Sequence, residues 1–309
     1  MFAPKDHSLL VPYDGSFDVH EAPTKPEKEK DGWKEKLAAE VEALGAAQHR
    51  LFADGRFAVL LVFQALDAAG KDGTIRHVFA GVNPSGLRVA SFKQPSSREQ
   101  AHDFLWRTTA ELPERGSVAI FNRSYYEEVL VVRVHPELLA AQKLPEPPSQ
   151  KFWDGRLRAI ADHERHLAEQ GTVILKFWLN VSKEEQRERL LERIDDPKKN
   201  WKFNARDLDE RELWDEYLAA YEHALRATSR PWAPWYAVPA DDKHYLRWQV
   251  AKLVNDALAS LETDFPKPDE ETRVALKAAK ERLSASNNEH STNRVRASQN
   301  FPTAPVVTT

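Results

Sequence analysis

An apolar run that ends in a turn of small residues constrains the fold of this chain more than any other feature. Residues Ala58–Phe63 (AVLLVF) are continuously apolar, as expected of a central parallel strand that helices cover on both faces. The segment Gln64–Lys71 (QALDAAGK) follows without a spacer and leads into a predicted helix at Asp72–Ala80. Backbone N–H groups in such a turn, together with the positive end of the helix, can bind anionic oxygens. The sequence therefore predicts an α/β fold with a phosphate-binding loop.

The loop departs from the GxxxxGK[ST] pattern at two positions. Ala65 replaces the first glycine, and Asp72 replaces the hydroxyl residue after Lys71. Since that hydroxyl binds magnesium in nucleoside-triphosphate loops, another ligand must replace it, and Asp67 is the nearest oxygen donor. The alternative interpretation is an ordinary strand-to-helix connection with a chance Gly-Lys pair.

Further strands and helices alternate along the chain, which predicts a parallel sheet. Strands are predicted at 87–92, 117–121 and 172–179 and within 231–239; helices are predicted at 33–52, 152–170, 183–194, 208–228 and 243–261, with one more that carries His102, Asp103, Trp106 and Arg107.

Polar side chains follow two of the predicted strands. Phe92 and Lys93 end the second strand, at the sheet edge where α/β proteins bind ligands. Asn122 and Arg123 follow the third strand, the usual place for a second magnesium contact in phosphate-loop folds, and Arg123 can meet a phosphate there. A plain strand end followed by a capped helix is the alternative.

A basic stretch lies between the predicted helices 183–194 and 208–228. From Lys198 to Arg206 the chain carries four basic residues and no acidic one, interleaved with Trp201 and Phe203. Such a run is often a solvated face. Together with the phosphate-binding loop, it favours a mobile basic lid that closes over a polyanion.

Composition narrows the possible functions of the 309-residue chain. Its 41% hydrophobic and 30% charged content is typical of a soluble globular protein, and a net charge of −4 argues against a nucleic-acid partner. The absence of cysteine excludes disulfides and thiolate chemistry. No apolar segment has the length of a signal peptide or a membrane span, so the expectation is a cytoplasmic protein without a membrane partner.

Five blocks, taken in order, resemble one known family. They are ALDAAGKDG, SFKQPS with HDFLWR, FNRSYYEEVLVVRVHP, RIDDPKKNWKFN and PWYAVPADDK, and they span Trp33–Leu261. Together they resemble polyphosphate kinase family 2, and most of all its third class. The third class is similar in carrying asparagine at the position of Asn122, where other classes have aspartate, whereas Tyr125 departs from the histidine of many relatives.

The resemblance implies a fold and an activity. The implied fold is a three-layer α/β/α P-loop kinase fold, thymidylate-kinase-like, with a five-stranded parallel sheet and a helical lid. The implied reaction is the Mg2+-dependent, reversible transfer of the terminal phosphoryl group of inorganic polyphosphate to nucleoside mono- and diphosphates (AMP to ADP, ADP to ATP). Adenine nucleotides are the expected acceptors, with guanine nucleotides as an alternative, and the expected assembly is a homodimer or homotetramer.

The same resemblance gives roles to individual residues. Asp67 would bind magnesium, Lys71 the phosphates, Arg123 the phosphoryl group in transit and Arg193 the lid side of the polyphosphate. The expected phosphate-binding residues are Ala68, Ala69, Gly70, Lys71, Asp72, Gly73 and Thr74 in the loop, with Lys198, Lys199 and Lys202 in the lid. The expected acceptor site comprises Phe92, Lys93, Asp103, Arg107, Asn122, Glu127 and Glu128, with Asn122 as a second metal ligand.

Three regions are expected along the chain. Residues 1–32 are predicted to form an extended arm, residues 33–265 the P-loop phosphotransferase domain with its lid at about 189–211, and residues 266–309 a partly disordered tail with one helix at 269–283.

Two other classes of protein stay open. An ATP-dependent small-molecule or nucleotide kinase would use the same loop, but it would normally carry Ser or Thr where Asp72 stands. A non-catalytic module that binds polyanions would keep the basic stretch, but it would have no reason to hold Asp67 and Lys71 in one turn.

Overall fold

Five parallel strands form one sheet in the order β2-β3-β1-β4-β5. The computed structural model describes residues 2–27, 32–145 and 148–298. The strands are β1 (Ala58–Gln64), β2 (Leu87–Ser91), β3 (Val118–Asn122), β4 (Thr172–Asn180) and β5 (Trp235–Pro239). The predicted five-stranded parallel sheet is therefore confirmed.

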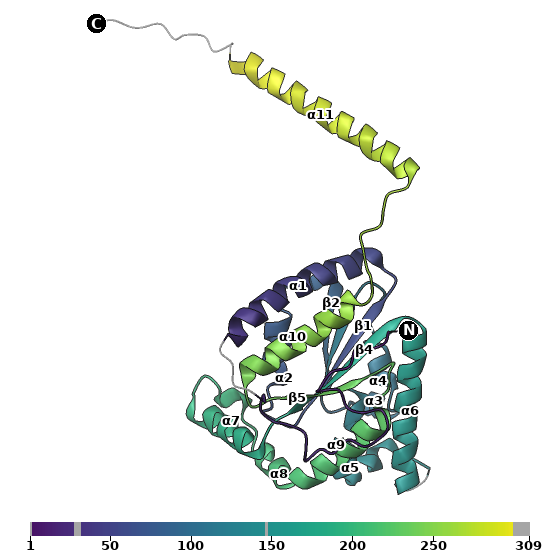
Figure 1. Cartoon of the computed structure of the whole chain (residues 1–309), viewed down its shortest axis with the longest axis vertical. Coiled ribbons are helices and arrows are strands. Elements are labelled where there is room, and N and C mark those ends of the chain that lie inside the picture. The colour runs from purple at the N-terminus through teal and green to yellow at the C-terminus, as the bar shows by residue number, and fades with distance from the viewer. Residues whose placement is uncertain (1, 28–31, 146–147, 299–309) are drawn as a thin grey trace, which may run out of the picture. The chain divides into compact units, whose positions relative to one another are not determined.

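Helices cover both faces of the sheet, which gives the three predicted layers (Figure 1). The α-helices up to Asp264 are α1 (Trp33–Asp54), α2 (Lys71–Val78), α3 (Ser97–Gln100), α4 (Trp106–Thr109), α5 (Val131–Val134), α6 (Gln150–Glu169), α7 (Lys183–Asp195), α8 (Arg206–Glu212), α9 (Trp214–Thr228) and α10 (Lys243–Ala259). Short 3-10 turns are η1 (Pro84–Gly86), η2 (Tyr125–Glu128), η3 (Pro136–Gln142) and η4 (Asn200–Lys202).

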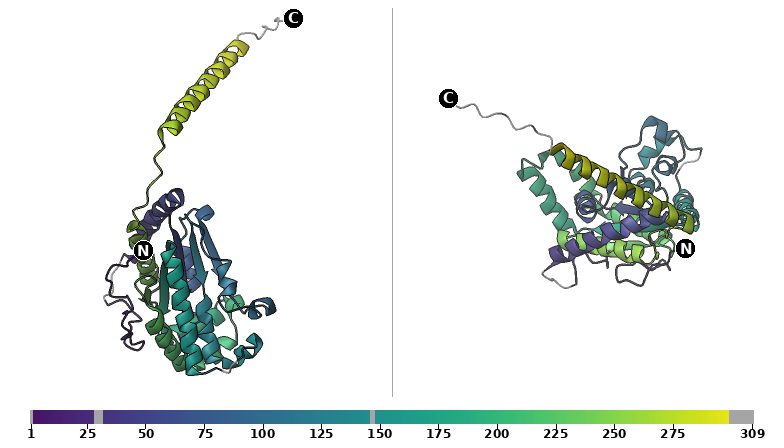
Figure 2. Two further views of the ribbon diagram at one scale, coloured as in Figure 1. Left: turned by 90° about the vertical axis from the view of Figure 1, so that its right-hand side faces the viewer. Right: turned by 90° about the horizontal axis from the view of Figure 1, so that it is seen from above.

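The side chains of β1 alternate between two cores, as the pleat of a strand requires. Val59, Leu61 and Phe63 pack in the core of α1, α2 and α10, whereas Leu60 and Val62 pack in the core of α6 and α9. Figure 2 shows the same layers from a second direction. All seven residues of β1 are buried, which explains the unbroken apolar run that the sequence displays.

The register of β1 and β3 brings their carboxyl ends together. Phe63 lies opposite Asn122, and the backbone N–H of Arg123 donates to the carbonyl of Phe63 at 3.0 Å. The loop after β1 and the polar residues after β3 therefore meet at one edge of the sheet, as predicted.

The N-terminal arm lies against the edge strand β5. Leu10 forms an isolated antiparallel bridge with Tyr236, and backbone hydrogen bonds flank it, from Val11 to Trp235 at 2.9 Å and from Ala237 to Leu9 at 2.8 Å. The arm thereby covers an edge that would otherwise present unpaired backbone groups. Met1 and residues 28–31 of the predicted arm, and residues 146–147 beyond β3, lie outside the described residues.

Two helix predictions for the part of the chain before Phe265 are wrong in their extent. The helix expected around His102–Arg107 is two short helices, α3 and α4, because the Asp103 carboxylate accepts from the backbone N–H of Leu105 at 3.0 Å and so favours a turn between them. The helix expected at 208–228 is likewise divided into α8 and α9, since Leu213 has a non-helical ψ of 25°.

The second unit of the chain starts at Phe265. It contains α11 (Glu270–Ser298), so the predicted helix end at Leu283 is wrong, and residues 299–309 of the expected disordered tail lie outside the described residues. Among the helices that the structure describes, none is long and apolar enough to cross a membrane.

Candidate active site

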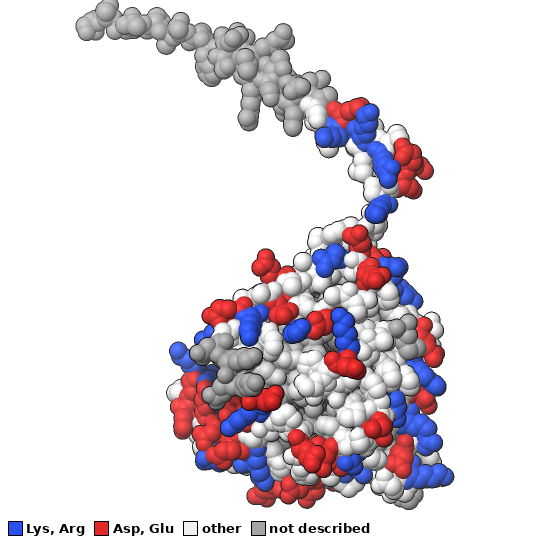
Figure 3. All heavy atoms as spheres, in the orientation of Figure 1, with Lys and Arg blue, Asp and Glu red and all other residues white. Residues whose placement is uncertain are grey.

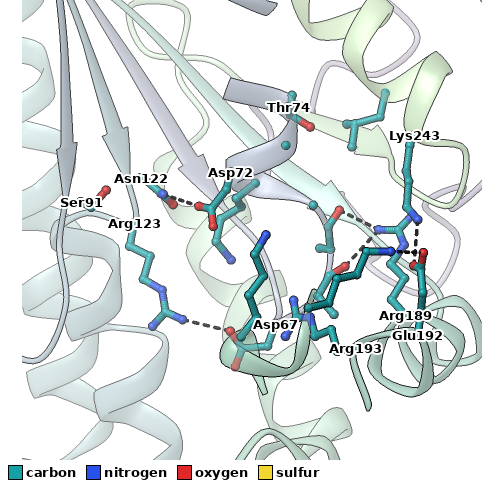
Figure 4. A pocket seen from close by; sticks show the side chains of 18 of the residues that line it. Asp67, Asp72, Thr74, Ser91, Asn122, Arg123, Arg189, Glu192, Arg193 and Lys243 are labelled. Carbon is teal, nitrogen blue, oxygen red and sulfur yellow. Dashed lines mark hydrogen bonds and ion pairs between the residues drawn. The ribbon is translucent and has the colours of Figure 1, made fainter. Parts of the chain in front are cut away.

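A cavity of about 770 Å³ opens at the carboxyl edge of the sheet. Its lining comes from the loop after β1 and the start of α2, the ends of β2 and β3, the lid region and the start of α10 (Figure 4). Nine Lys and Arg side chains line it, against three Asp and Glu. This excess is local, because the protein as a whole has a net charge of −4 and the face seen in Figure 3 mixes both signs. The cavity is therefore built for an anion.

The loop after β1 is a tight turn with two left-handed residues. Ala68 and Gly70 both have positive φ angles, 61° and 102°, and Ala69 is buried. A Cβ on Gly70 would come within 3.6 Å of the Arg189 guanidinium and would be strained by the backbone angle. The conformation of the loop thus explains Gly70 and the burial explains Ala69, whereas Ala68 adopts a positive φ although it carries a Cβ.

Arg189 of α7 holds this loop from behind, and the sequence analysis gave it no role. Its guanidinium donates to the carbonyls of Ala68 (3.1 Å) and Ala69 (2.9 Å), and also to those of Ala240 (2.6 Å) and Asp241 (3.0 Å). The carbonyls of Ala68 and Ala69 are therefore already hydrogen-bonded to Arg189. The sequence spacing could have indicated a role for Arg189, because it lies four residues before Arg193 and hence on the same face of α7.

Lys71 bends back over the loop. Its ammonium donates to the carbonyl of Ala65 at 2.7 Å and to that of Leu66 at 3.4 Å. Burial, and after it the neighbouring Arg123, lower the pKa of Lys71 to about 8, while Asp67 opposes the shift. A bound anion would favour the charged form of this lysine.

Asp67 and Arg123 form an ion pair of 3.0 Å at the floor of the cavity. Glu127 holds the other side of the guanidinium at 3.3 Å and is the main reason why the pKa of Arg123 is raised. Arg123 has a φ of 64°, an angle that is strained for a residue with a Cβ and that occurs preferentially at functional sites. The geometry thus fixes Arg123 between two carboxylates.

The side chains of Asn122 and Asp72 both line the cavity and contact each other directly. The Asn122 amide donates to the Asp72 carboxylate at 2.7 Å, which leaves the amide oxygen of Asn122 as an acceptor (Figure 4). The hydroxyl of Thr74 is buried and has no hydrogen-bond partner among the described residues. The cavity therefore keeps oxygen atoms for a ligand near the loop.

These oxygens fit a hard cation such as Mg2+. Among the residues that the structure describes, no three His, Cys, Asp or Glu side chains could hold a metal ion by themselves. Mg2+ does not require such a set, because it usually keeps several waters and binds one or two carboxylates together with substrate phosphates. Asp67 and the amide oxygen of Asn122 match that pattern of ligands.

The predicted lid contributes Arg193, Lys199 and Lys202 to the cavity. Arg193 is paired with Asp207 of α8 at 3.1 Å, and Lys199 with Glu192 at 2.5 Å. Lys198 is exposed and is not in the cavity lining, so its expected contact with phosphate stays a prediction.

The expected acceptor residues are divided. Phe92 and Lys93 line the cavity, but Asp103, Arg107 and Glu128 do not. Arg107 instead supports the Phe92-Lys93 turn, because it donates to the carbonyl of Lys93 at 2.8 Å and lies over the Phe92 ring at 5.6 Å.

Glu128 points into the protein, where it is buried and paired with Arg156 at 3.1 Å. The tight turn η2 directs the consecutive residues Glu127 and Glu128 to different sides, and only Glu127 faces Arg123. Asp103, Arg107 and Glu128 therefore lie outside the lining of the large cavity, and their contact with the acceptor stays a prediction.

A second cavity, of about 230 Å³, shares Asp67 and Arg123 with the first. Carboxylates outnumber basic groups in its lining, which also includes Glu127, Asp207 and Glu210, the phenols of Tyr217 and Tyr221, the amides of Gln186 and Asn204 and the guanidinium of Arg206. The Tyr217 hydroxyl donates to Glu210 at 2.6 Å. The sequence did not reveal this pocket, because it depends on the angle between α8 and α9.

The start of α10 supplies three more lining residues that the sequence analysis missed, namely Lys243, Leu246 and Arg247. The signal was their position: they follow β5, and the carboxyl ends of all parallel strands share one edge. Lys243 reaches across to Glu192 of α7 at 3.6 Å.

The family model of polyphosphate kinase 2 (PPK2) matches residues 27–266. The chain belongs to the polyphosphate kinase 2 family. An ADP-polyphosphate phosphotransferase from Rhodopseudomonas palustris is 50% identical over 271 residues, which cover 86% of this chain and 94% of that protein. An AMP/ADP-polyphosphate phosphotransferase from Meiothermus ruber is 49% identical over 235 residues, covering 76% and 84%.

A solved structure gives the same family. The crystal structure of polyphosphate kinase 2 from Arthrobacter aurescens TC1 is similar with a TM-score of 0.80 and 38% sequence identity, and the match covers 90% of this chain and 98% of that chain. The predicted P-loop kinase fold is confirmed by this likeness. Membership of the third class stays a prediction.

Proposed function

We propose that this protein is a Mg2+-dependent phosphotransferase that moves the terminal phosphoryl group of inorganic polyphosphate to nucleoside mono- and diphosphates, in a reversible reaction. The observation that carries the proposal is the cationic cavity at the phosphate-binding loop, with nine basic and three acidic lining side chains. A polyanionic donor explains such an excess better than a single nucleotide does. The relatives named as ADP- and AMP/ADP-polyphosphate phosphotransferases support it.

The two cavities have complementary chemistry. The larger one is basic and suits the polyphosphate end, whereas the smaller one offers Glu127 and Glu210 carboxylates beside aromatic walls from Trp214 and Tyr217. Carboxylates accept hydrogen bonds from the amino groups of bases, and aromatic rings stack on them. We therefore place the acceptor nucleotide with its base in the smaller cavity and its phosphates toward Arg123.

Transfer would occur at the wall that both cavities share, where Asp67 and Arg123 lie. The attacking atom is an oxygen of the acceptor phosphate, and it bonds to the terminal phosphorus as the bridging oxygen of the polyphosphate leaves. Because this oxygen is already deprotonated, no general base is required, and catalysis comes from positioning and charge neutralisation. Arg123 and Lys71 supply cationic hydrogen-bond donors for that purpose.

Mg2+ would be held by Asp67 and the Asn122 amide oxygen. When bound, it would neutralise charge on the phosphate oxygens. We also propose a homodimer or homotetramer, on the strength of the family resemblance, and light scattering after size exclusion measures this directly.

A direct assay tests the proposed function. ATP is measured by luminescence after the protein is mixed with ADP, Mg2+ and polyphosphate, and ADP after mixing with AMP. We expect nucleotide formation that depends on both polyphosphate and Mg2+. Consumption of ATP with a small-molecule acceptor and no activity with polyphosphate would instead identify an ATP-dependent kinase.

The role of the lid in polyphosphate binding can be tested with two of its lysines, one inside and one outside the cavity lining. Lys202→Gln is expected to raise the KM for polyphosphate several-fold with little effect on the KM for the nucleotide, because a cation in the cavity lining is lost. Lys198→Gln removes the same charge from the same turn outside the lining and should have a smaller effect. Steady-state kinetics at two salt concentrations measure both. Equal changes for both variants would mean that only the net charge of the lid matters.

A further inference from the structure

Basic side chains continue from the cavity mouth over the adjoining ends of α2, α10 and α1. We define the α2–α10 cationic surface as Lys34, Arg76, His77, His244 and Arg247. Helix α10, which carries His244 and Arg247, packs against both α1 and α2. Only Arg247 also lines the cavity, so the surface and the cavity meet at this residue.

Arg247 sits directly on the phosphate-binding loop. Its guanidinium lies 3.5 Å from the position that a Cβ on Gly73 would occupy, and the ring of His77 is hydrogen-bonded through Nδ1 to the carbonyl of Gly73 at 2.7 Å. A ligand that touches the loop at Gly73 therefore meets the first residues of the surface.

The base of the surface is rigid. Trp33 of α1 stacks on Trp248 of α10 with ring centroids 4.7 Å apart, and the edge of Trp33 meets Tyr245 at 5.2 Å. Lys36 caps the stack at 4.5 Å from the Trp33 ring. Lys34 thus projects from a helix end that is fixed against α10.

The positive charges of this surface are not neutralised within the described part of the chain. Neither Lys34, Arg76 nor Arg247 forms an ion pair with a described carboxylate, whereas Arg56, Arg187 and Lys252 elsewhere on the surface each do. The acid that faces His244 is Asp242, and this carboxylate is already the N-cap of α10, where it accepts from the backbone N–H groups of His244 (2.7 Å) and Tyr245 (3.1 Å).

The like charges of this surface lie close enough together to lower one another's pKa. Burial lowers the pKa of Arg247, and Arg76 and Arg189 lower it further. The pKa of His244 is lowered by burial and then by Lys34 and Arg247, with Asp242 opposing. Repulsion between like charges destabilises the folded state. An anionic partner outside the chain would explain why these charges are nevertheless held together.

The chemistry of the donor identifies that partner. Each internal phosphate of polyphosphate is charged, and only the terminal groups take part in transfer, so the remainder of the chain must leave the cavity. A nucleotide has too few phosphates to extend beyond it. We propose that the α2–α10 cationic surface binds the distal phosphates of the polyphosphate whose end lies at the phosphate-binding loop. This inference rests on the proposed function, and it makes the affinity depend on the chain length of the donor.

The test uses two exposed residues of the surface that lie outside the cavity lining. The double variant Lys34→Gln/Arg76→Gln is assayed with size-fractionated polyphosphate from short to long chains, at saturating nucleotide and Mg2+. For the wild type, the KM for polyphosphate, expressed per polyphosphate molecule, should fall as the molecules become long enough to reach the α2–α10 cationic surface. For the variant, we expect the KM for long chains to rise by roughly tenfold at low salt, with kcat and the KM for the shortest active chains unchanged.

A matched control separates position from net charge. Lys151→Gln/Arg158→Gln removes two exposed charges from α6, on the other face of the sheet, and should leave the length dependence unchanged. An unaltered length dependence in Lys34→Gln/Arg76→Gln would overturn the proposal while leaving the proposed function intact. A flattened dependence in Lys198→Gln/Lys202→Gln alone would show that the chain leaves over the lid. Inactivity of the wild type with every polyphosphate would contradict the proposed function itself.

Discussion

Replacement of Asp67 by asparagine is expected to lower kcat/KM for nucleotide phosphorylation by about 100-fold or more, as for other groups that act on charge in a transition state. Asp67 lies in the wall shared by both cavities and is paired with Arg123 at 3.0 Å. Asparagine keeps the size of the side chain but removes the negative charge that orients the guanidinium and would hold the metal. Steady-state kinetics with polyphosphate and ADP measure the loss.

The control for this substitution is Asp162→Asn on α6. Asp162 is also paired with an arginine, Arg165, at 3.0 Å, but the pair is exposed and outside both cavities. We expect unchanged activity in the control and a thermal midpoint close to that of the wild type in both variants. Activity of Asp67→Asn within about tenfold of the wild type would remove Asp67 from the mechanism.

Much of the candidate site was predictable because its signals are local. The apolar run of β1 and the Ala/Gly turn after it follow from burial and backbone conformation at adjacent positions. The parallel order of the strands then places Asn122 and Arg123 beside the loop, because residues at carboxyl ends share an edge. Asp67, Lys71, Arg123 and the lid could therefore be assembled from the sequence.

The positions of individual side chains were harder to predict where neighbouring residues diverge in space. Glu127 and Glu128 are adjacent in sequence, yet one faces Arg123 and the other is buried against Arg156. Both belong to the 3-10 turn η2, and nothing in the composition of that segment distinguishes it from a helix start. Arg107 was expected at the ligand, but it supports the turn that lines the cavity.

Contacts between segments that are distant in the chain could not be predicted from the sequence either. Arg189 donates to the carbonyls of Ala68 and Ala69, which lie 121 and 120 residues before it in the sequence. The smaller cavity depends on the break between α8 and α9 at Leu213. Both features follow from tertiary packing, and local propensity carries no information about them.

Tyr125 belongs to a buried polar network. Its hydroxyl and that of Tyr126 both donate to Glu164 of α6 at 2.9 Å. Glu164 is paired with Lys176 of β4 at 2.6 Å, and neither side chain is exposed to any extent. Lys176 also donates to the carbonyl of Thr228 at 2.8 Å. The network thereby links α6, β4 and the end of α9 to the turn that follows Arg123.

Glu164→Gln is expected to lower the free energy of unfolding by about 3–5 kcal/mol, because the substitution leaves the buried Lys176 charge without its partner. Urea unfolding measures the change. Asp162→Asn, two residues earlier on the same helix, breaks an exposed pair and should cost no more than about 1 kcal/mol. The double variant Glu164→Gln/Lys176→Met, which removes both charges, should recover part of the loss.

The loss in Glu164→Gln should also depend on pH, with a sign that follows from Lys176. Burial lowers the pKa of Lys176 to about 8, and Glu164 opposes that shift, so the pKa falls further in the variant. In the unfolded chain the pKa of a lysine is about 10.4. Between the two values the unfolded state binds more protons, so stability rises with pH, and this rise begins at a lower pH in the variant than in the wild type. The difference in stability between the two proteins should therefore shrink as the pH is raised from 6 toward about 8. A difference that is constant over this range would mean that Lys176 is already neutral in the wild type, and the network would then be a set of neutral hydrogen bonds.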